Sequence, residues 1–133
     1  MRTLPARAAL VWLLIVVAET VHGIARRLWL EPRIGDLPAR QVGVVIGSLL
    51  ILAVAVLMAR WLAVRTRRQA FAVGVGWALA MIAFEVGIGV ATGATADRMV
   101  SDYDPRRGGF MALGMLVLVC APWWAARWRG TLR

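Results

Sequence analysis

The stretch QVGVVIGSLLILAVAVLMA, residues 41–59, contains no charged side chain. About 20 apolar residues in a helix cross the hydrocarbon core of a bilayer. Lipid offers no hydrogen-bond partners to the backbone, so a segment that spans it must be helical. This stretch therefore predicts a transmembrane helix.

Three further apolar runs have the same character, at about residues 8–25, 69–90 and 108–126. The chain of 133 residues is 61% hydrophobic with a mean hydropathy of +0.72, whereas apolar residues make up about half of a soluble domain. We therefore expect an all-α fold, an integral membrane bundle of four transmembrane helices with short loops, as a single domain over residues 1–133. Asp36 with Pro38 and Asp104 with Pro105 predict the starts of the second and fourth helices.

The net charge is +9, and all 16 basic residues are arginines. These arginines fall between the apolar runs, where the expected partners are anionic lipid headgroups rather than nucleic acid. Arginine without lysine, in a chain rich in alanine, valine, leucine and glycine, indicates GC-rich coding and hence a bacterium. The balance of arginines between alternate loops favours both termini in the cytoplasm. We expect a bacterial inner (plasma) membrane protein.

The amino-terminal run has an alternative interpretation. Arg2 and Arg7, an apolar core, and the small residues Val16 and Ala18 ahead of Glu19 are typical of a secretory signal. The apolar character resumes after Glu19, which favours a span that is retained.

Polar residues interrupt two of the spans. Glu19, His22 and Arg26 share one helical face at positions i, i+3 and i+7. Glu85 lies at a similar depth in the third span. An ionisable side chain within a span is costly unless it faces protein, water or a partner. We therefore predict an outward-facing pocket, with ligand-binding or proton-binding residues Glu19, His22, Arg26, Glu85, Asp102 and Tyr103.

A purely structural alternative is open for the same residues. Glu19 could pair with Arg26, and Glu85 with Arg40, only to fix the register of the helices. Tyr103 between Asp102 and Asp104 is also typical of a solvated turn and helix cap.

Small residues suggest how the helices pack. Gly43 and Gly47, four residues apart, let helix backbones approach closely in lipid, and so do Gly87, Gly89 and Gly93, which follow Glu85. Such a stripe also suits a homodimer face. Cys120, the only cysteine, is expected to be a small buried apolar side chain.

Three classes of function fit these features. The first is a non-catalytic ligand-binding or accessory module of a membrane complex, with membrane lipids as partners and a homodimer or larger membrane complex as a further option. The second is a proton-coupled transporter of small molecules or ions. In Ala18, Glu19 and its helix count the chain resembles the small multidrug resistance exporters, in which such a glutamate exchanges protons for cationic drugs. It departs from them in His22, Glu85 and its long charged loops.

The third class is a metal-dependent membrane enzyme, which the sequence favours least. "ETVH" (residues 19–22) has the Glu-x-x-His spacing that places two ligands on one metal in helix bundles. If a metal binds, the candidate ligands are Glu19, His22 and Glu85. We otherwise expect no cofactor, no metal and no catalytic residue.

Overall fold

The computed structural model describes residues 3–133, and those residues form helices and no strands. Four helices are long and apolar enough to cross a membrane, which confirms the predicted fold class. They are α1 (Leu4–Ala25), α3 (Asp36–Leu62), α4 (Arg67–Ala91) and α6 (Met111–Trp128).

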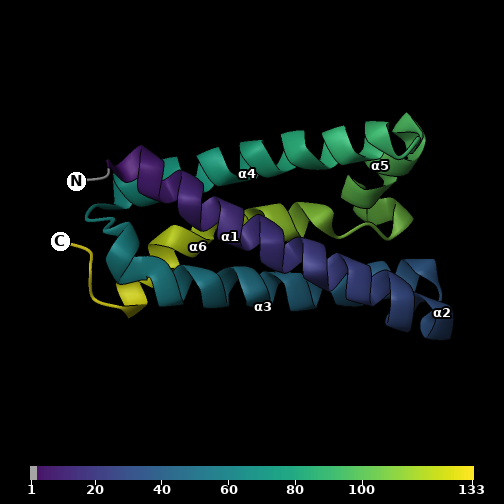
Figure 1. Ribbon diagram of the computed structural model, residues 1–133, viewed down its shortest axis with the longest axis horizontal. Coiled ribbons are helices and arrows are strands. Elements are labelled where there is room, and N and C mark those ends of the chain that lie inside the picture. The colour runs from purple at the N-terminus through teal and green to yellow at the C-terminus, as the bar shows by residue number, and fades with distance from the viewer. Residues whose placement is uncertain (1–2) are drawn as a thin grey trace.

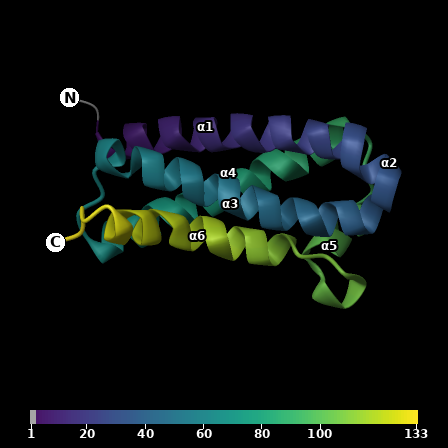
Figure 2. The same cartoon turned by 90° about the horizontal axis from the view of Figure 1, so that it is seen from below.

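The bundle has two distinct ends. The start of α1 and the end of the chain lie at one end, which we call the termini end, and α2 and α5 lie at the other, the loop end (Figures 1 and 2). Helix α6 packs against both α3 and α4, and α1 packs mainly against α3. This arrangement leaves α1 free to lean away from α4.

The termini half holds a packed apolar core. Val11, Ile15, Leu62, Val64 and Leu118 are all at most 2% exposed. A Cβ on Gly74 of α4 would collide with the backbone carbonyl of Val119, so glycine permits α4 and α6 to touch there. The backbones of two spans thus meet at a glycine that the sequence did not single out.

Helix α1 crosses the bundle obliquely. Near the termini end the indole nitrogen of Trp77 in α4 donates to the carbonyl oxygen of Ala8 at 2.9 Å, and further along α1 Trp12 meets Phe84 edge to face. Toward the loop end α1 has moved over to α3 (Figure 1). The two outer helices, α1 and α4, therefore diverge and leave space between them.

The first connection continues the helix rather than breaking it. A π-helical turn, η1 (Arg26–Leu30), joins α1 to the short α2 (Glu31–Ile34). Pro32 has no N–H and its ring crowds the preceding turn, which gives a physical reason for the wider winding. Gly35 then turns the chain with φ +91°, and α3 begins at Asp36 as predicted.

The connection from α4 to α6 differs from the prediction. It contains the helix α5 (Ala96–Tyr103) and a 3₁₀ turn, η2 (Pro105–Arg107). Asp104 accepts a hydrogen bond from the Arg106 amide but caps only that turn, since Gly108 follows in the left-handed region with φ +78°. The predicted start of the fourth helix at Asp104–Pro105 is wrong, because α6 begins at Met111.

The prediction that Cys120 is buried is also wrong. Its side chain is exposed on the outer face of α6. In a span of this kind an outward apolar residue meets lipid instead of the protein core, and periodicity alone does not separate the two.

Candidate functional site

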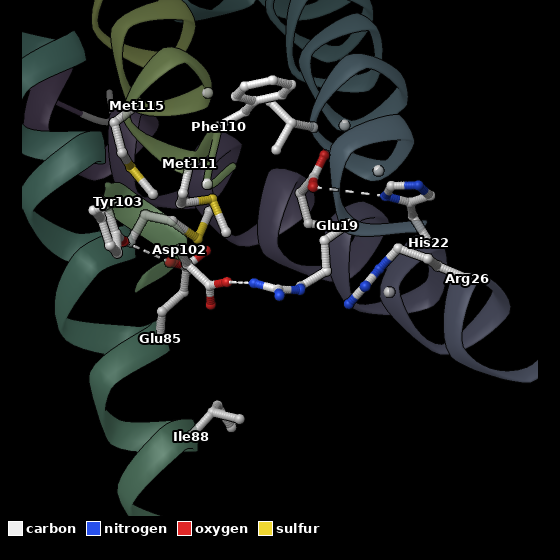
Figure 3. A pocket seen from close by; sticks show the side chains of 18 of the residues that line it. Glu19, His22, Arg26, Glu85, Ile88, Asp102, Tyr103, Phe110, Met111 and Met115 are labelled. Atoms are coloured by element: carbon white, nitrogen blue, oxygen red, sulfur yellow. Dashed lines mark hydrogen bonds and ion pairs between the residues drawn. The ribbon is translucent and has the colours of Figure 1, made fainter. Parts of the chain in front are cut away.

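A cavity of about 430 Å³ lies at the loop end, in the space that α1 and α4 leave between them. Residues of α1, η1, α3, α4, α5 and α6 line it (Figure 3). Its volume falls in the range of small-molecule sites, about 300–1,000 Å³. The deep wall is apolar and includes Val16, Ile51, Met81, Met115 and Leu118.

The structure brings all the predicted site residues to the wall of this one cavity. Their convergence is a structural finding, and their role in binding stays a prediction. They are Glu19, His22, Arg26, Glu85, Asp102 and Tyr103.

Glu19 occupies a niche that a glycine creates. A Cβ on Gly47 of α3 would stand 2.7 Å from Oε2 of Glu19, closer than real side chains approach. Within residues 3–133, the ion-pair contact of Glu19 is with Nδ1 of His22 at 3.8 Å. Its other oxygen, Oε1, is buried without a hydrogen-bond partner. A buried carboxylate oxygen without a donor is unfavourable, so Glu19 keeps an unused acceptor beside the cavity.

Arg26 lies one turn of α3 nearer the loop end. A Cβ on Gly43 would stand 2.7 Å from Cδ of Arg26 and 3.8 Å from Cε1 of His22. Among residues 3–133 no carboxylate lies within ion-pair distance of the Arg26 guanidinium. Gly43 and Gly47 were predicted to let backbones approach, but in the structure they make room for polar side chains of α1 and η1.

The opposite wall joins α4 to α5. The Tyr103 hydroxyl donates to Oε2 of Glu85 at 2.8 Å (Figure 3). Burial, together with the nearby Glu85 carboxylate, raises the pKa of the Tyr103 phenol above its usual value. Tyr103 therefore stays a hydrogen-bond donor. The interpretation of Tyr103 and Asp102 as a solvated turn is wrong, and only Asp104 acts as a cap.

Arginines fasten α5 to the start of α3. Arg40 forms ion pairs with Asp102 of α5 and, at 3.1 Å, with Asp36 one turn earlier in α3. Arg98 of α5 forms two hydrogen bonds to Asp36, at 2.8 and 3.1 Å. These contacts hold α5 against the start of α3. In the described part of the chain, Nε of Arg40 is buried and has no hydrogen-bond partner.

The two ion pairs of the structural alternative do not form. Glu19 contacts His22 rather than Arg26, and Arg40 contacts aspartates rather than Glu85. These two pairs therefore do not fix the register of the helices, and they do not explain why Glu19 and Arg26 lie within a span.

Sequence reasoning missed Arg40 and Arg98 as cavity residues. A signal for Arg40 was present, because it lies three and seven residues before Gly43 and Gly47 and thus on their face of the helix. No comparable signal exists for Arg98, whose position depends on how α5 folds back.

The three candidate metal ligands do not form a metal site. Within residues 3–133 no cluster of three histidine, cysteine, aspartate or glutamate side chains is arranged to hold an ion. Glu85 lies on the other wall, hydrogen-bonded to Tyr103, while Glu19 and His22 lie together on α1. The grouping of Glu19, His22 and Glu85 around one metal is therefore wrong for this structure.

The cavity therefore presents the Glu19 carboxylate and the guanidiniums of Arg26 and Arg40 next to an apolar deep wall. No family model, no curated protein and no solved structure matches the chain.

Proposed function

We propose that this chain is a multi-pass protein of a bacterial inner membrane whose cavity, facing outward, binds a ligand without catalysing a reaction. It would act alone or as an accessory module of a membrane complex. The observation that carries the proposal is a set of polar groups on residues that line one cavity wall. Among residues 3–133, Oε1 of Glu19 and Nε of Arg40 are buried without a hydrogen-bond partner, and no carboxylate pairs with the Arg26 guanidinium. A structural ion cluster satisfies its own members, whereas a binding site leaves groups for the ligand.

Transport is the less favoured candidate. Two carboxylates, Glu19 and Glu85, line the cavity, as a proton-coupled carrier requires. Below the cavity, however, the core of Val11, Ile15 and Leu118 is closed, and a carrier would have to open it. A static binding site needs no such opening, so binding is favoured over transport.

The experiment is native mass spectrometry of the full-length protein released from its own membranes in detergent. We expect the wild type to retain a non-protein ligand, and Glu19→Gln to lose at least about tenfold in occupancy, since a charge-assisted hydrogen bond contributes about 1.5–3 kcal/mol. Glu31→Gln is the matched control, because Glu31 does not line the cavity.

Equal ligand occupancy in Glu19→Gln and the wild type would contradict the proposal. Loss of a co-purifying protein in Glu19→Gln but not in Glu31→Gln would support the accessory role. Acid-dependent uptake into vesicles that both Glu19→Gln and Glu85→Gln abolish would instead favour transport.

A further inference from the structure

The unpaired groups of the cavity wall define the kind of ligand that would satisfy them. Oε1 of Glu19 needs a hydrogen-bond donor, and a carboxylate prefers a cationic one. Nε of Arg40 lacks an acceptor, and the Arg26 guanidinium has no carboxylate partner among residues 3–133. Guanidiniums match phosphate or carboxylate oxygens. One ligand that serves all three is a zwitterion with an N–H-bearing cation and an oxygen-rich anion.

The spacing along α3 limits the distance between the two charges. The Glu19 carboxylate lies at the level of Gly47 and the Arg26 side chain at the level of Gly43. One helical turn of four residues separates these levels, which is about 6 Å. Ammonium and anion must therefore be joined by a short linker.

The cavity is open sideways between α1 and α4. Ile24, Val86 and Ile88 line it and are 55%, 47% and 47% exposed. Gly23 lines it too, and a Cβ there would meet nothing within 4 Å. In a bilayer this opening faces acyl chains, so a ligand that is partly lipid can enter from the side.

The depth of the basic groups fits a lipid phosphate. Arg26 and Arg27 follow directly on the apolar run of α1, where guanidiniums reach the level of the headgroups. A phosphate held there would let an attached amine reach one turn deeper, to Glu19, while the chains stay outside against Ile24 and Val86.

We propose, resting on the binding function proposed above, that the cavity takes the headgroup of an aminophospholipid. Its phosphate accepts hydrogen bonds from Arg26 and from Nε of Arg40, its primary ammonium donates to Glu19, and its acyl chains lie in the opening between α1 and α4. A lipid with a quaternary amine has no N–H for Glu19. An anionic lipid without an amine leaves Glu19 unsatisfied.

The test measures binding of dihexanoyl phosphatidylethanolamine, phosphatidylcholine and phosphatidylglycerol to the full-length protein in detergent. We expect phosphatidylethanolamine to bind at least about tenfold more tightly than the other two, since it alone offers both a phosphate to the arginines and an N–H-bearing ammonium to Glu19. Glu19→Gln should remove this preference, and Arg26→Gln should weaken all three lipids. Glu31→Gln and Arg33→Gln, outside the cavity, should bind as the wild type does.

A second variant guards against misfolding of Glu19→Gln. Gly47→Ala displaces the Glu19 carboxylate without changing its charge, and should reduce the preference for phosphatidylethanolamine in the same direction. A folded Gly47→Ala protein with unchanged preference would overturn the ammonium contact.

Three other outcomes overturn the inference in distinguishable ways. Equal binding of phosphatidylglycerol and phosphatidylethanolamine to the wild type excludes recognition of the ammonium. Binding of glycerophosphoethanolamine as tight as that of the lipid assigns the site to a water-soluble zwitterion. If no lipid binds while Glu19→Gln still releases a co-purified ligand, this inference fails and the binding function stands; if nothing is released either, both fail.

Discussion

The Glu19 carboxylate lies against Gly47, so close that a single added methyl group would stand 2.7 Å from Oε2. The glycine is thus a niche for an acid of the neighbouring helix, and Gly43 does the same for Arg26 one turn away. The two helices α1 and α3 are held with polar side chains between them. This pairing of acid and glycine makes the site sensitive to very small changes on α3.

Gly47→Ala should move Glu19 without unfolding the protein. The atom in the way is the end of a flexible side chain, so we expect a loss of stability below about 1.5 kcal/mol and a clear loss of ligand. Gly74→Ala should instead cost about 3 kcal/mol, because its Cβ meets backbone of α6 that cannot move aside. Gly114→Ala, with 3.7 Å to its nearest neighbour, is the neutral control. Thermal unfolding in detergent measures all three, and an equal effect of Gly47→Ala and Gly74→Ala would contradict the packing described.

Tyr103 should resist ionisation. It is the only tyrosine, so phenolate absorbance near 295 nm reports this residue alone. Burial and Glu85 raise its pKa, and we expect the folded protein to remain un-ionised well above pH 10, where an unfolded tyrosine titrates. A phenol whose pKa is higher in the folded state stabilises the fold below about pH 10, and that contribution disappears as pH rises through the folded value.

Glu85→Gln is the control for this titration. It removes the carboxylate charge but not the burial, so the midpoint should fall part of the way back. A wild-type midpoint near 10 would show that Tyr103 is not held against Glu85 in solution.

Arg40→Gln should loosen α5. The change leaves Asp102 without its cation in a partly buried setting, and we expect a loss of about 1–3 kcal/mol. Amide hydrogen exchange should rise within residues 96–103. Arg107→Gln breaks the pair with Asp97, which is 77% exposed, and should leave stability nearly unchanged because water screens such a pair. Unchanged exchange in α5 after Arg40→Gln would show that the Arg40 pair with Asp102 does not hold α5 in place.

Ser48→Cys should be modified by a membrane-impermeant thiol reagent, because Ser48 lines the cavity. Leu57→Cys, 73% exposed on the lipid face of α3, should not react, since a thiolate does not form in hydrocarbon. Both variants are made in a Cys120→Ala background. In sealed cells, reaction from the outside supports the proposed orientation, whereas reaction of Ser48→Cys only from the cytoplasmic face would reverse it.

The sequence by itself determined the four helices. In lipid, an apolar segment such as residues 41–59 can satisfy its backbone hydrogen bonds only by forming a helix. It also determined that Glu19, His22 and Arg26 share a face, because helical periodicity is local. Which side chains meet across helices was decided only by the tertiary structure. Arg40 pairs with aspartates and not with Glu85, and Gly43 and Gly47 contact side chains rather than a helix backbone. Both contacts depend on the angles at which the helices cross, which the sequence pattern does not give. The path of α5 depended on the same long-range geometry: it places Tyr103 on Glu85, 18 residues earlier in the chain, and no local pattern encodes that contact.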